Sequence, residues 1–299
     1  CLKKLNIRIK FHYFDKKSFC STFTFSIAVF LQAIVNQINQ NLDSLILGAM
    51  VKPSLVTIYS IALTIYTCYC SMTSIVGNIF VPHVAKMIEN KATGKELTDL
   101  IIRTGRFQFM GALSVITAFI VLGKGFITIW VGTDKIEVYY ITLILIIPMT
   151  ISLIQSTGNA VLDSMLKKMG RSIILLIMAV INVILSIIFI KKIGYFGAAF
   201  GTAISVLVGN GLILNIYMHK VFNFEIRRFF KEVIERIMPC CIIAAAITLP
   251  FEMFISTTRL TFIMKCLIFL LVDIVALYFY GMNDYEKDVV KGMMNKFKK

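Results

Sequence analysis

The chain has 299 residues and a mean hydropathy of +0.83, with 58% hydrophobic and 16% charged residues. Because charged residues make up about a quarter of soluble globular domains, this composition excludes a soluble protein and indicates several membrane spans. The net charge of +15 does not indicate a nucleic-acid partner, because the lysines and arginines lie between apolar runs and form no basic stretch interleaved with aromatics.

Eight apolar runs are long enough, or nearly so, to cross a hydrocarbon core of about 30 Å as α-helices. They cover residues 19–42, 54–82, 107–130, 138–160, 172–190, 195–218, 237–256 and 260–281. We therefore predict an all-α fold, a polytopic membrane bundle of about eight transmembrane helices. Pro148 and Pro250 lie inside the fourth and seventh runs, where each removes a backbone hydrogen bond and is expected to kink its helix.

The positive charges divide unequally between the two sides of these eight spans. The N-terminal segment and every second loop carry 24 lysines and arginines, whereas the opposite loops carry 6. Loops rich in lysine and arginine remain in the cytoplasm. The division therefore predicts that both termini are cytoplasmic.

Polar residues recur along one face of the first predicted helix. Gln32, Asn36, Asn39, Gln40 and Asp43 follow one another at spacings that fall on one helical face. An unpaired polar group in hydrocarbon is costly, so this face should contact protein or water. It forms either the wall of a hydrated cavity that binds sugar hydroxyls or a seam of hydrogen bonds between helices.

The second and fourth predicted helices carry further candidates for the same cavity. Tyr66 and Asn78 belong to a face of the second helix on which tyrosines could stack against sugar rings. Ser152, Gln155 and Asn159 repeat the polar pattern on the fourth helix. In both helices packing between neighbours is the alternative.

The sixth predicted helix has a ridge of small residues. Gly197, Gly201, Ser205 and Gly209 recur at intervals of four. Small residues at this spacing let two membrane helices approach closely. We expect these four residues to serve helix packing.

Asp273 is an acidic residue near the middle of the eighth predicted helix. Ionisable groups inside a membrane often bind protons or ions, so Asp273 is a candidate proton or cation site, with packing against a polar partner as the alternative. Lys265 is nearer the end of the same helix and is expected to extend outward.

The sequence contains no residue pattern typical of an enzyme active site. The three histidines are far apart and have no nucleophile or ligand spacing around them. The pairs Cys68/Cys70 and Cys240/Cys241 lack the further cysteine or histidine ligands that a zinc site requires. We therefore expect no catalytic residues, no metal and no cofactor.

Two stretches resemble oligosaccharide flippases of the Wzx type, in the MOP exporter superfamily. They are residues 41–63, NLDSLILGAMVKPSLVTIYSIAL, and residues 158–205, which contain LDSMLKKMGR and KKIGYFGAAFGTAIS. The resemblance extends over essentially the whole chain. It implies two six-helix lobes that alternate access to a central cavity, often followed by two more helices.

The resemblance also implies how this chain is organised. It would be the C-terminal part of such a flippase and would lack the N-terminal lobe. The parts would be a cytoplasmic N-terminal segment of a fragment at 1–18, a six-helix C-lobe at 19–218, a cytoplasmic linker at 219–236, two additional transmembrane helices at 237–281 and a basic cytoplasmic tail at 282–299.

The function implied is export of a lipid-linked oligosaccharide during polysaccharide or lipopolysaccharide biosynthesis, in the bacterial cytoplasmic membrane. The substrate would be an undecaprenyl-linked glycan, with its sugars in the cavity and its tail among the membrane lipids. Such flippases hold the pyrophosphate with basic residues inside the cavity. The first six predicted helices carry no arginine or lysine near mid-membrane, so charge would come from the absent lobe or from helix ends such as Arg103 and Arg106.

Two other functions are less consistent with the sequence. A MATE-like cation-coupled drug exporter would need more buried acids than Asp43 and Asp273. A membrane-embedded glycan-modifying enzyme would need a large loop outside the membrane or a catalytic group of histidine, aspartate and arginine, and the sequence has neither.

Overall fold

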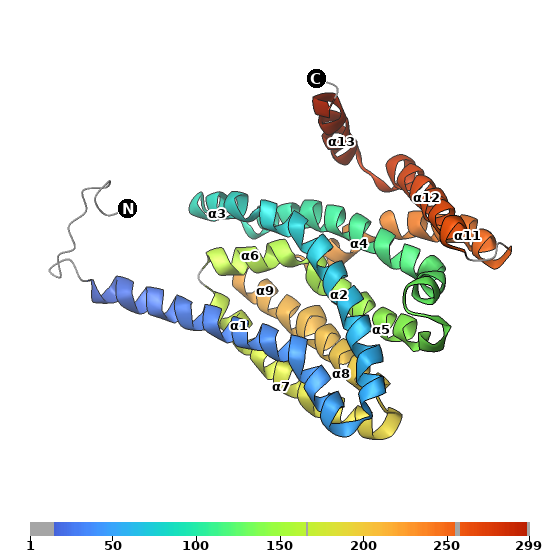
Figure 1. Ribbon diagram of the computed structural model, residues 1–299. Helices are drawn as coiled ribbons and strands as arrows, with labels where there is room; N and C mark the ends of the chain where they lie inside the picture. The colour runs from blue at the N-terminus through green and yellow to red at the C-terminus, as the bar shows by residue number, and fades with distance from the viewer. Residues whose placement is uncertain (1–14, 166, 255–257, 298–299) are drawn as a thin grey trace, which may run out of the picture.

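The computed structural model describes residues 15–165, 167–254 and 258–297, and every regular element in these ranges is helical (Figure 1). The α-helices are α1 (Lys16–Met50), α2 (Pro53–Ile79), α3 (Val81–Glu89), α4 (Gly94–Trp130), α5 (Glu137–Ile154), α6 (Ser156–Ser164), α7 (Lys168–Ile193), α8 (Phe196–Val206), α9 (Leu214–Phe222), α10 (Ile226–Ile234), α11 (Ile237–Phe254), α12 (Arg259–Ala276) and α13 (Asp284–Phe297). A 3-10 turn (Thr133–Lys135) precedes α5, and π-helical turns follow α8 (Leu207–Ile213) and α12 (Leu277–Gly281).

In the described residues, 7 helical stretches are long and apolar enough to cross a membrane. They correspond to the second to eighth predicted spans and confirm the all-α polytopic bundle. The first predicted span lies in α1, where the apolar stretch Thr22–Leu31 is shorter and includes residues whose side chains are not described. That span stays a prediction.

Local sequence signals shift several helix ends away from the apolar runs. The helix α4 begins well before its apolar run because Thr93 and Glu96 form a capping box, in which Thr93 N donates to Glu96 Oε2 at 2.7 Å. The fourth apolar run is divided at Gln155, between α5 and α6. Pro148 and Pro250 lie inside α5 and α11, as predicted.

The helices α7 and α8 pack closely through the small residues of α8. A Cβ atom at Gly197 would overlap the backbone of Phe189 and Ile190, and one at Gly201 would overlap Ser186. The helix α7 also packs against α1, and the two helices run side by side along one edge of the bundle (Figure 1). The contact of α7 with both neighbours brings distant parts of the sequence together.

The last two spans form a hairpin, α11 and α12, which packs against α4 on the side of the bundle away from α1 and α7 (Figure 1). Ser114 Oγ of α4 donates a hydrogen bond to Asp273 Oδ2 at 2.5 Å. Within the hairpin, Lys265 is buried and its Nζ lies 2.7 Å from Glu252 Oε2. Polar contacts therefore hold the hairpin together and attach it to α4.

Candidate functional site

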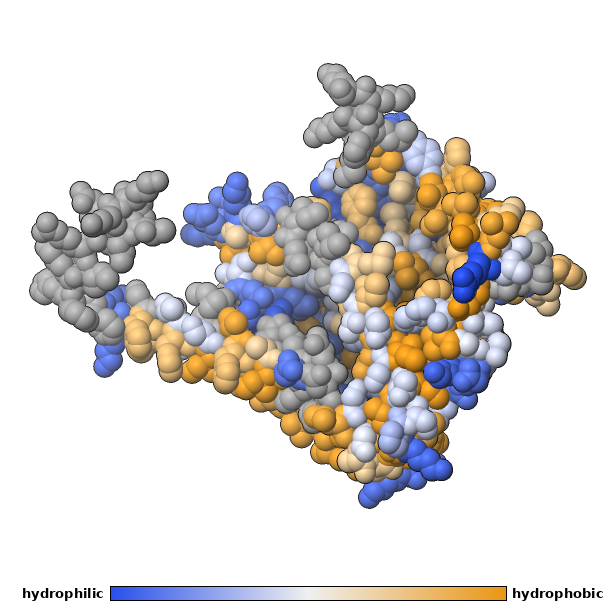
Figure 2. All heavy atoms as spheres, viewed as in Figure 1, coloured by the Kyte–Doolittle hydropathy of each residue, from blue (hydrophilic) through white to orange (hydrophobic). Residues whose placement is uncertain are grey.

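A polar cavity of about 190 Å³ lies among α1, α2, α5, α6, α7, α8 and the first π-helical turn. Its polar lining residues are Asp43, Tyr66, Ser152, Asn159, Arg171, Asn182, Thr202, Ser205 and Asn210. On the surface, Figure 2 shows a hollow between α1 and α3 with hydrophilic residues inside it. Among the described candidates, the cavity brings together Asp43 of α1, Tyr66 of α2, and Ser152 and Asn159 of the fourth predicted span.

One end of the cavity is a cluster of oxygen atoms around Asp43. This side chain is 2% exposed, and its Oδ2 accepts hydrogen bonds from Tyr59 OH at 3.0 Å and Thr202 Oγ1 at 2.6 Å. Asn182 Oδ1 lies 3.4 Å from Thr202 Oγ1 and accepts from Ser186 Oγ at 3.2 Å. A carboxylate, an amide oxygen and three hydroxyls are thus gathered from four helices, α1, α2, α7 and α8. Such oxygen donors can hold a proton or a hard cation.

The other end of the cavity contains Arg171, in the first turn of α7. The residue is 4% exposed, and its Nη2 lies 3.5 Å from Asp163 Oδ2 of α6. Eleven residues of α7 separate it from Asn182, which corresponds to about 16 Å along the helix axis. The cavity therefore has a guanidinium at one end and a carboxylate at the other.

Arg171 directly precedes the fifth predicted span, 172–190, and was therefore counted with the positively charged loops, whereas the structure places it in the first turn of α7. It lies at a helix end, so it does not contradict the expectation that the first six spans carry no basic residue near mid-membrane. Arg103 and Arg106, expected to supply charge from helix ends, line a different pocket. The sequence signal for Arg171 was weak, because a cation in the first turn of a membrane helix looks the same as a loop cation that marks topology.

Two oxygen atoms in the cavity wall have no hydrogen-bond partner in the described part of the chain. They are Asn159 Oδ1 and Ser205 Oγ, and both atoms are buried. Nearly all buried polar atoms in proteins have a partner, which can be protein or water. These two atoms are therefore positioned to accept hydrogen bonds from molecules inside the cavity.

Gln155 does not line the cavity, although the sequence placed it on the same face as Asn159. Its Nε2 donates to Asn215 Oδ1 at 2.8 Å, and Asn215 Nδ2 donates to the carbonyl oxygens of Asn210 and Gly211 in the π-helical turn. The break at Gln155 is the reason for the difference, because Gln155 lies between α5 and α6 whereas Asn159 is inside α6, so the assumed continuous helical spacing fails. Gln155 thus connects the α5–α6 junction to the π-helical turn.

Among the other predicted residues, Asp43, Tyr66 and Asn159 line the cavity, and so do Ser205 and Gly209, which we had assigned to helix packing. Asn182 and Thr202 also line it, although they were not predicted as cavity residues. The side chains of five candidates lie outside the described residues, so their role stays a prediction; they are Gln32, Asn36, Asn39, Gln40 and Asn78.

Asp273 lies away from this cavity, at the contact of α4, α11 and α12. Besides its bond from Ser114, its Oδ1 lies 3.7 Å from Cys241 Sγ. The residue is 2% exposed. The predicted proton or cation role of Asp273 stays a prediction.

Comparison with known proteins places this geometry in context. A family model described as "Polysaccharide biosynthesis protein" matches residues 3–139. The structure of the lipid II flippase MurJ in an inward closed conformation matches with a TM-score of 0.66 and 19% sequence identity, over 88% of this chain and 55% of that chain. A MOP superfamily transporter from Pyrococcus furiosus matches with a TM-score of 0.52 and 15% identity, over 86% of this chain and 61% of that chain. No curated protein sequence matches significantly.

These findings confirm the resemblance predicted from the sequence. The chain has the fold of MOP-superfamily membrane transporters, and its N-terminal part carries the pattern of polysaccharide biosynthesis proteins. The two similar structures are those of a flippase and a transporter. The chain spans 55% of the length of the MurJ chain.

Proposed function

We propose that this chain forms one wall of the substrate pathway in a transporter that flips lipid-linked oligosaccharides by alternating access. The observation that carries the proposal is the cavity, which lies among apolar spans and yet contains buried acceptor atoms on Asn159 and Ser205 without partners in the described chain. Sugar hydroxyls both donate and accept hydrogen bonds, so they match an amide and a hydroxyl. Tyr66 adds a ring in the same wall.

We further propose that Arg171 binds the phosphate that links the sugars to the lipid. A guanidinium binds phosphate oxygens through two parallel hydrogen bonds and keeps its charge when buried. Arg171 is in the first turn of α7. In our proposal this turn lies near the membrane surface, at the level of the phosphates of lipid-linked sugars. The sugars would then extend toward Asp43 and Asn182, about 16 Å further along α7.

The volume of the cavity supports a substrate pathway to which this chain contributes only one wall. Pockets for drug-sized ligands have volumes of about 300–1,000 Å³. A cavity of about 190 Å³ holds only part of an oligosaccharide. In our proposal a second lobe supplies the opposite wall, the carrier is an undecaprenyl lipid, and the protein acts in the bacterial cytoplasmic membrane with both termini inside.

A drug-exporting function is less compatible with the same cavity. Asp43 is an acidic residue of the cavity wall, but its Oδ2 already accepts two hydrogen bonds. Arg171 adds a positive charge to the same wall. A cationic drug would be repelled by Arg171 and would have to displace the bonds of Asp43. We therefore favour a sugar-containing substrate with a negatively charged linkage.

The proposal can be tested by complementation of a bacterial strain that lacks its oligosaccharide flippase, with the protein expressed from its complete gene. We expect the wild-type protein to restore surface polysaccharide, and Asn159→Leu and Arg171→Gln to abolish it while protein abundance in the membrane stays normal. Lipid-linked precursor should then accumulate on the cytoplasmic side.

Asn215→Leu is the matched control, because it removes a buried amide whose bonds are all within the protein. We expect this variant to lower abundance and export in parallel. Normal export by Asn159→Leu and Arg171→Gln would contradict the proposal. A parallel loss of abundance and export in those variants would also contradict it and would assign both residues to helix packing.

A further inference from the structure

Asp163, the last but one residue of α6, lies against two cations of the first turn of α7. Its Oδ2 lies 3.5 Å from Arg171 Nη2 and 3.7 Å from Lys168 Nζ. The two cations are three residues apart on α7 and therefore share one face of that helix. Because one carboxylate faces two cations, this group of three side chains keeps a positive charge that the carboxylate does not neutralise.

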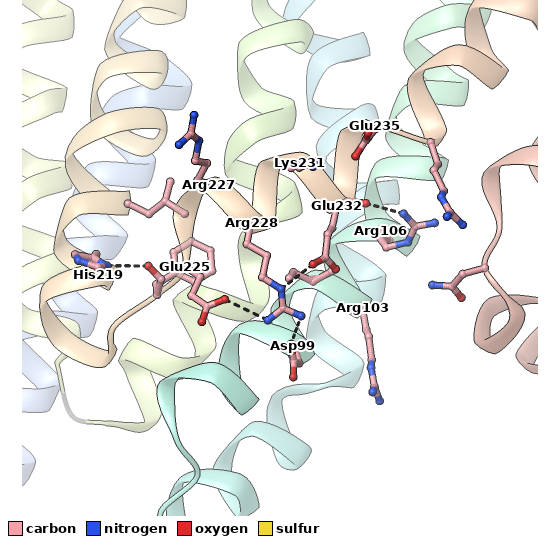
Figure 3. A pocket seen from close by; sticks show the side chains of 15 residues that line it. Asp99, Arg103, Arg106, His219, Glu225, Arg227, Arg228, Lys231, Glu232 and Glu235 are labelled. Carbon is pink, nitrogen blue, oxygen red and sulfur yellow. Dashed lines mark hydrogen bonds and ion pairs between the residues drawn. The ribbon is translucent and has the colours of Figure 1, made fainter.

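The group around Arg228, in the pocket lined by α4 and α10, has the opposite ratio of charges (Figure 3). Arg228 lies 2.7 Å from Asp99 and 3.2 Å from Glu225. It also lies 2.7 Å from Glu232, and Figure 3 shows these side chains converging. Three carboxylates there surround one guanidinium. That group has no positive charge left for an anion, whereas the group around Asp163 has.

The contacts of Asp163 are longer than those of the ion pairs that hold other helices together. Arg106 and Glu286 lie 2.6 Å apart, and Lys265 and Glu252 lie 2.7 Å apart, as in strong charge-assisted hydrogen bonds. The second carboxylate oxygen, Asp163 Oδ1, is buried and has no hydrogen-bond partner in the described part of the chain. Asp163 is therefore held loosely, and a stronger anion can take its place.

Membrane topology alone does not account for this arrangement. Cations that fix topology need only lie in a cytoplasmic loop, and the neighbouring Lys167 is exposed. Arg171, by contrast, is 4% exposed and lines the cavity. Cations are also unfavourable in the first turn of a helix, where the helix dipole is positive, and α7 has no acidic residue in that turn. An anion bound there would offset this cost.

We propose that Asp163 engages Arg171 and Lys168 before substrate binds, and that the substrate phosphate displaces Asp163 and then contacts both cations. This inference rests on the proposed function, because it uses the phosphate contact of Arg171. It adds Lys168 as a second phosphate-binding residue and Asp163 as a competitor of the phosphate. A phosphate has several strong acceptor oxygens and more negative charge than one carboxylate, so it can displace Asp163, whereas a neutral glycan cannot.

The exchange can be tested by isothermal titration calorimetry on the protein expressed from its complete gene and purified in detergent. The probe is farnesyl diphosphate, a short isoprenyl lipid with a diphosphate head. We expect Asp163→Asn to strengthen its binding roughly fivefold, because the competing carboxylate is removed, and Lys168→Gln to weaken it roughly fivefold. Farnesol, which lacks the diphosphate, should bind no better to Asp163→Asn than to the wild type. A gain with farnesol equal to that with farnesyl diphosphate would overturn the exchange.

Two matched variants control for the change of charge. Asp99→Asn removes a carboxylate that lies 2.7 Å from Arg228, and Lys167→Gln removes the exposed neighbour of Lys168. We expect both variants to bind farnesyl diphosphate with nearly wild-type affinity. Equal gains in Asp163→Asn and Asp99→Asn, or equal losses in the two lysine variants, would overturn the exchange in favour of general attraction by charge.

Arg171→Gln separates this inference from the proposed function. We expect it to weaken the binding of farnesyl diphosphate roughly 30-fold. That loss without a gain in Asp163→Asn would overturn the exchange alone, whereas unchanged binding by Arg171→Gln would overturn the phosphate contact and the exchange with it. A large fall in the unfolding temperature of ligand-free Asp163→Asn would also overturn the exchange, because Asp163 would then be a structural residue.

Discussion

The polar cavity and the contact between α4 and α13 both bury charged groups, but they use them in different ways. At the α4–α13 contact, Arg106 Nε and Nη2 donate to Glu286, Nη2 also donates to the Gly281 carbonyl, and Nη1 donates to the Glu232 carbonyl. In the cavity, Asn159 Oδ1 and Ser205 Oγ accept no bond from a described residue. The closed network holds helices together, whereas the open one is available to a ligand.

The energetic reason for this difference is the cost of leaving a buried polar group unpaired. A buried charge stabilises a fold only when a partner and enough hydrogen bonds compensate for lost hydration. Glu286 meets this condition, since its Oε2 also accepts from Asn283 N at 2.8 Å. The cavity atoms avoid the cost only if the cavity contains water or substrate.

The largest effect on stability is expected from breaking the ion pair between Arg106 and Glu286. Glu286→Ala leaves the Arg106 guanidinium buried without its carboxylate and should lower the free energy of unfolding by about 3–5 kcal/mol. Chemical unfolding in detergent would measure the loss. Replacing both Arg106 and Glu286 by Met should be much less harmful, because no unpaired charge remains. An equal loss in the single and double variants would show that packing at this contact matters more than charge pairing.

A smaller effect is expected at the Asp43 end of the cavity, where the Asp43 carboxylate accepts hydrogen bonds from other residues of the protein. Thr202→Val removes the hydroxyl that donates to Asp43 at 2.6 Å and should lower the free energy of unfolding by about 1–3 kcal/mol. The control is Thr64→Val, because the exposed Thr64 hydroxyl bonds only to the Ser60 carbonyl of its own helix. Similar unfolding curves for both variants would mean that Asp43 does not depend on Thr202.

The smallest effect is expected where the cavity wall is open. Ser205→Ala removes a buried hydroxyl that has no partner in the described chain, so the free energy of unfolding should change by less than about 0.5 kcal/mol. The same unfolding assay applies. A loss above about 1 kcal/mol would show that Ser205 makes a structural hydrogen bond and would remove the contrast between the two regions.

The sequence was sufficient to predict the spans and part of the cavity. Hydropathy identified the apolar runs, and polar residues inside those runs, Asp43 and Asn159 among them, line the cavity. It did not predict that Asn182 and Thr202 approach Asp43, because helices far apart in the chain come together only through packing. The break at Gln155 was also missed, since a continuous apolar run gives no sign of where a helix is interrupted.

The Arg106 network also has a mechanical consequence. One guanidinium joins α4 to α10, to the π-helical turn after α12 and to the first turn of α13. Separating any of these segments from α4 would leave a buried charge or carbonyl without its partner. In the proposed transport cycle, the last two spans should therefore move together with α4 as one rigid body.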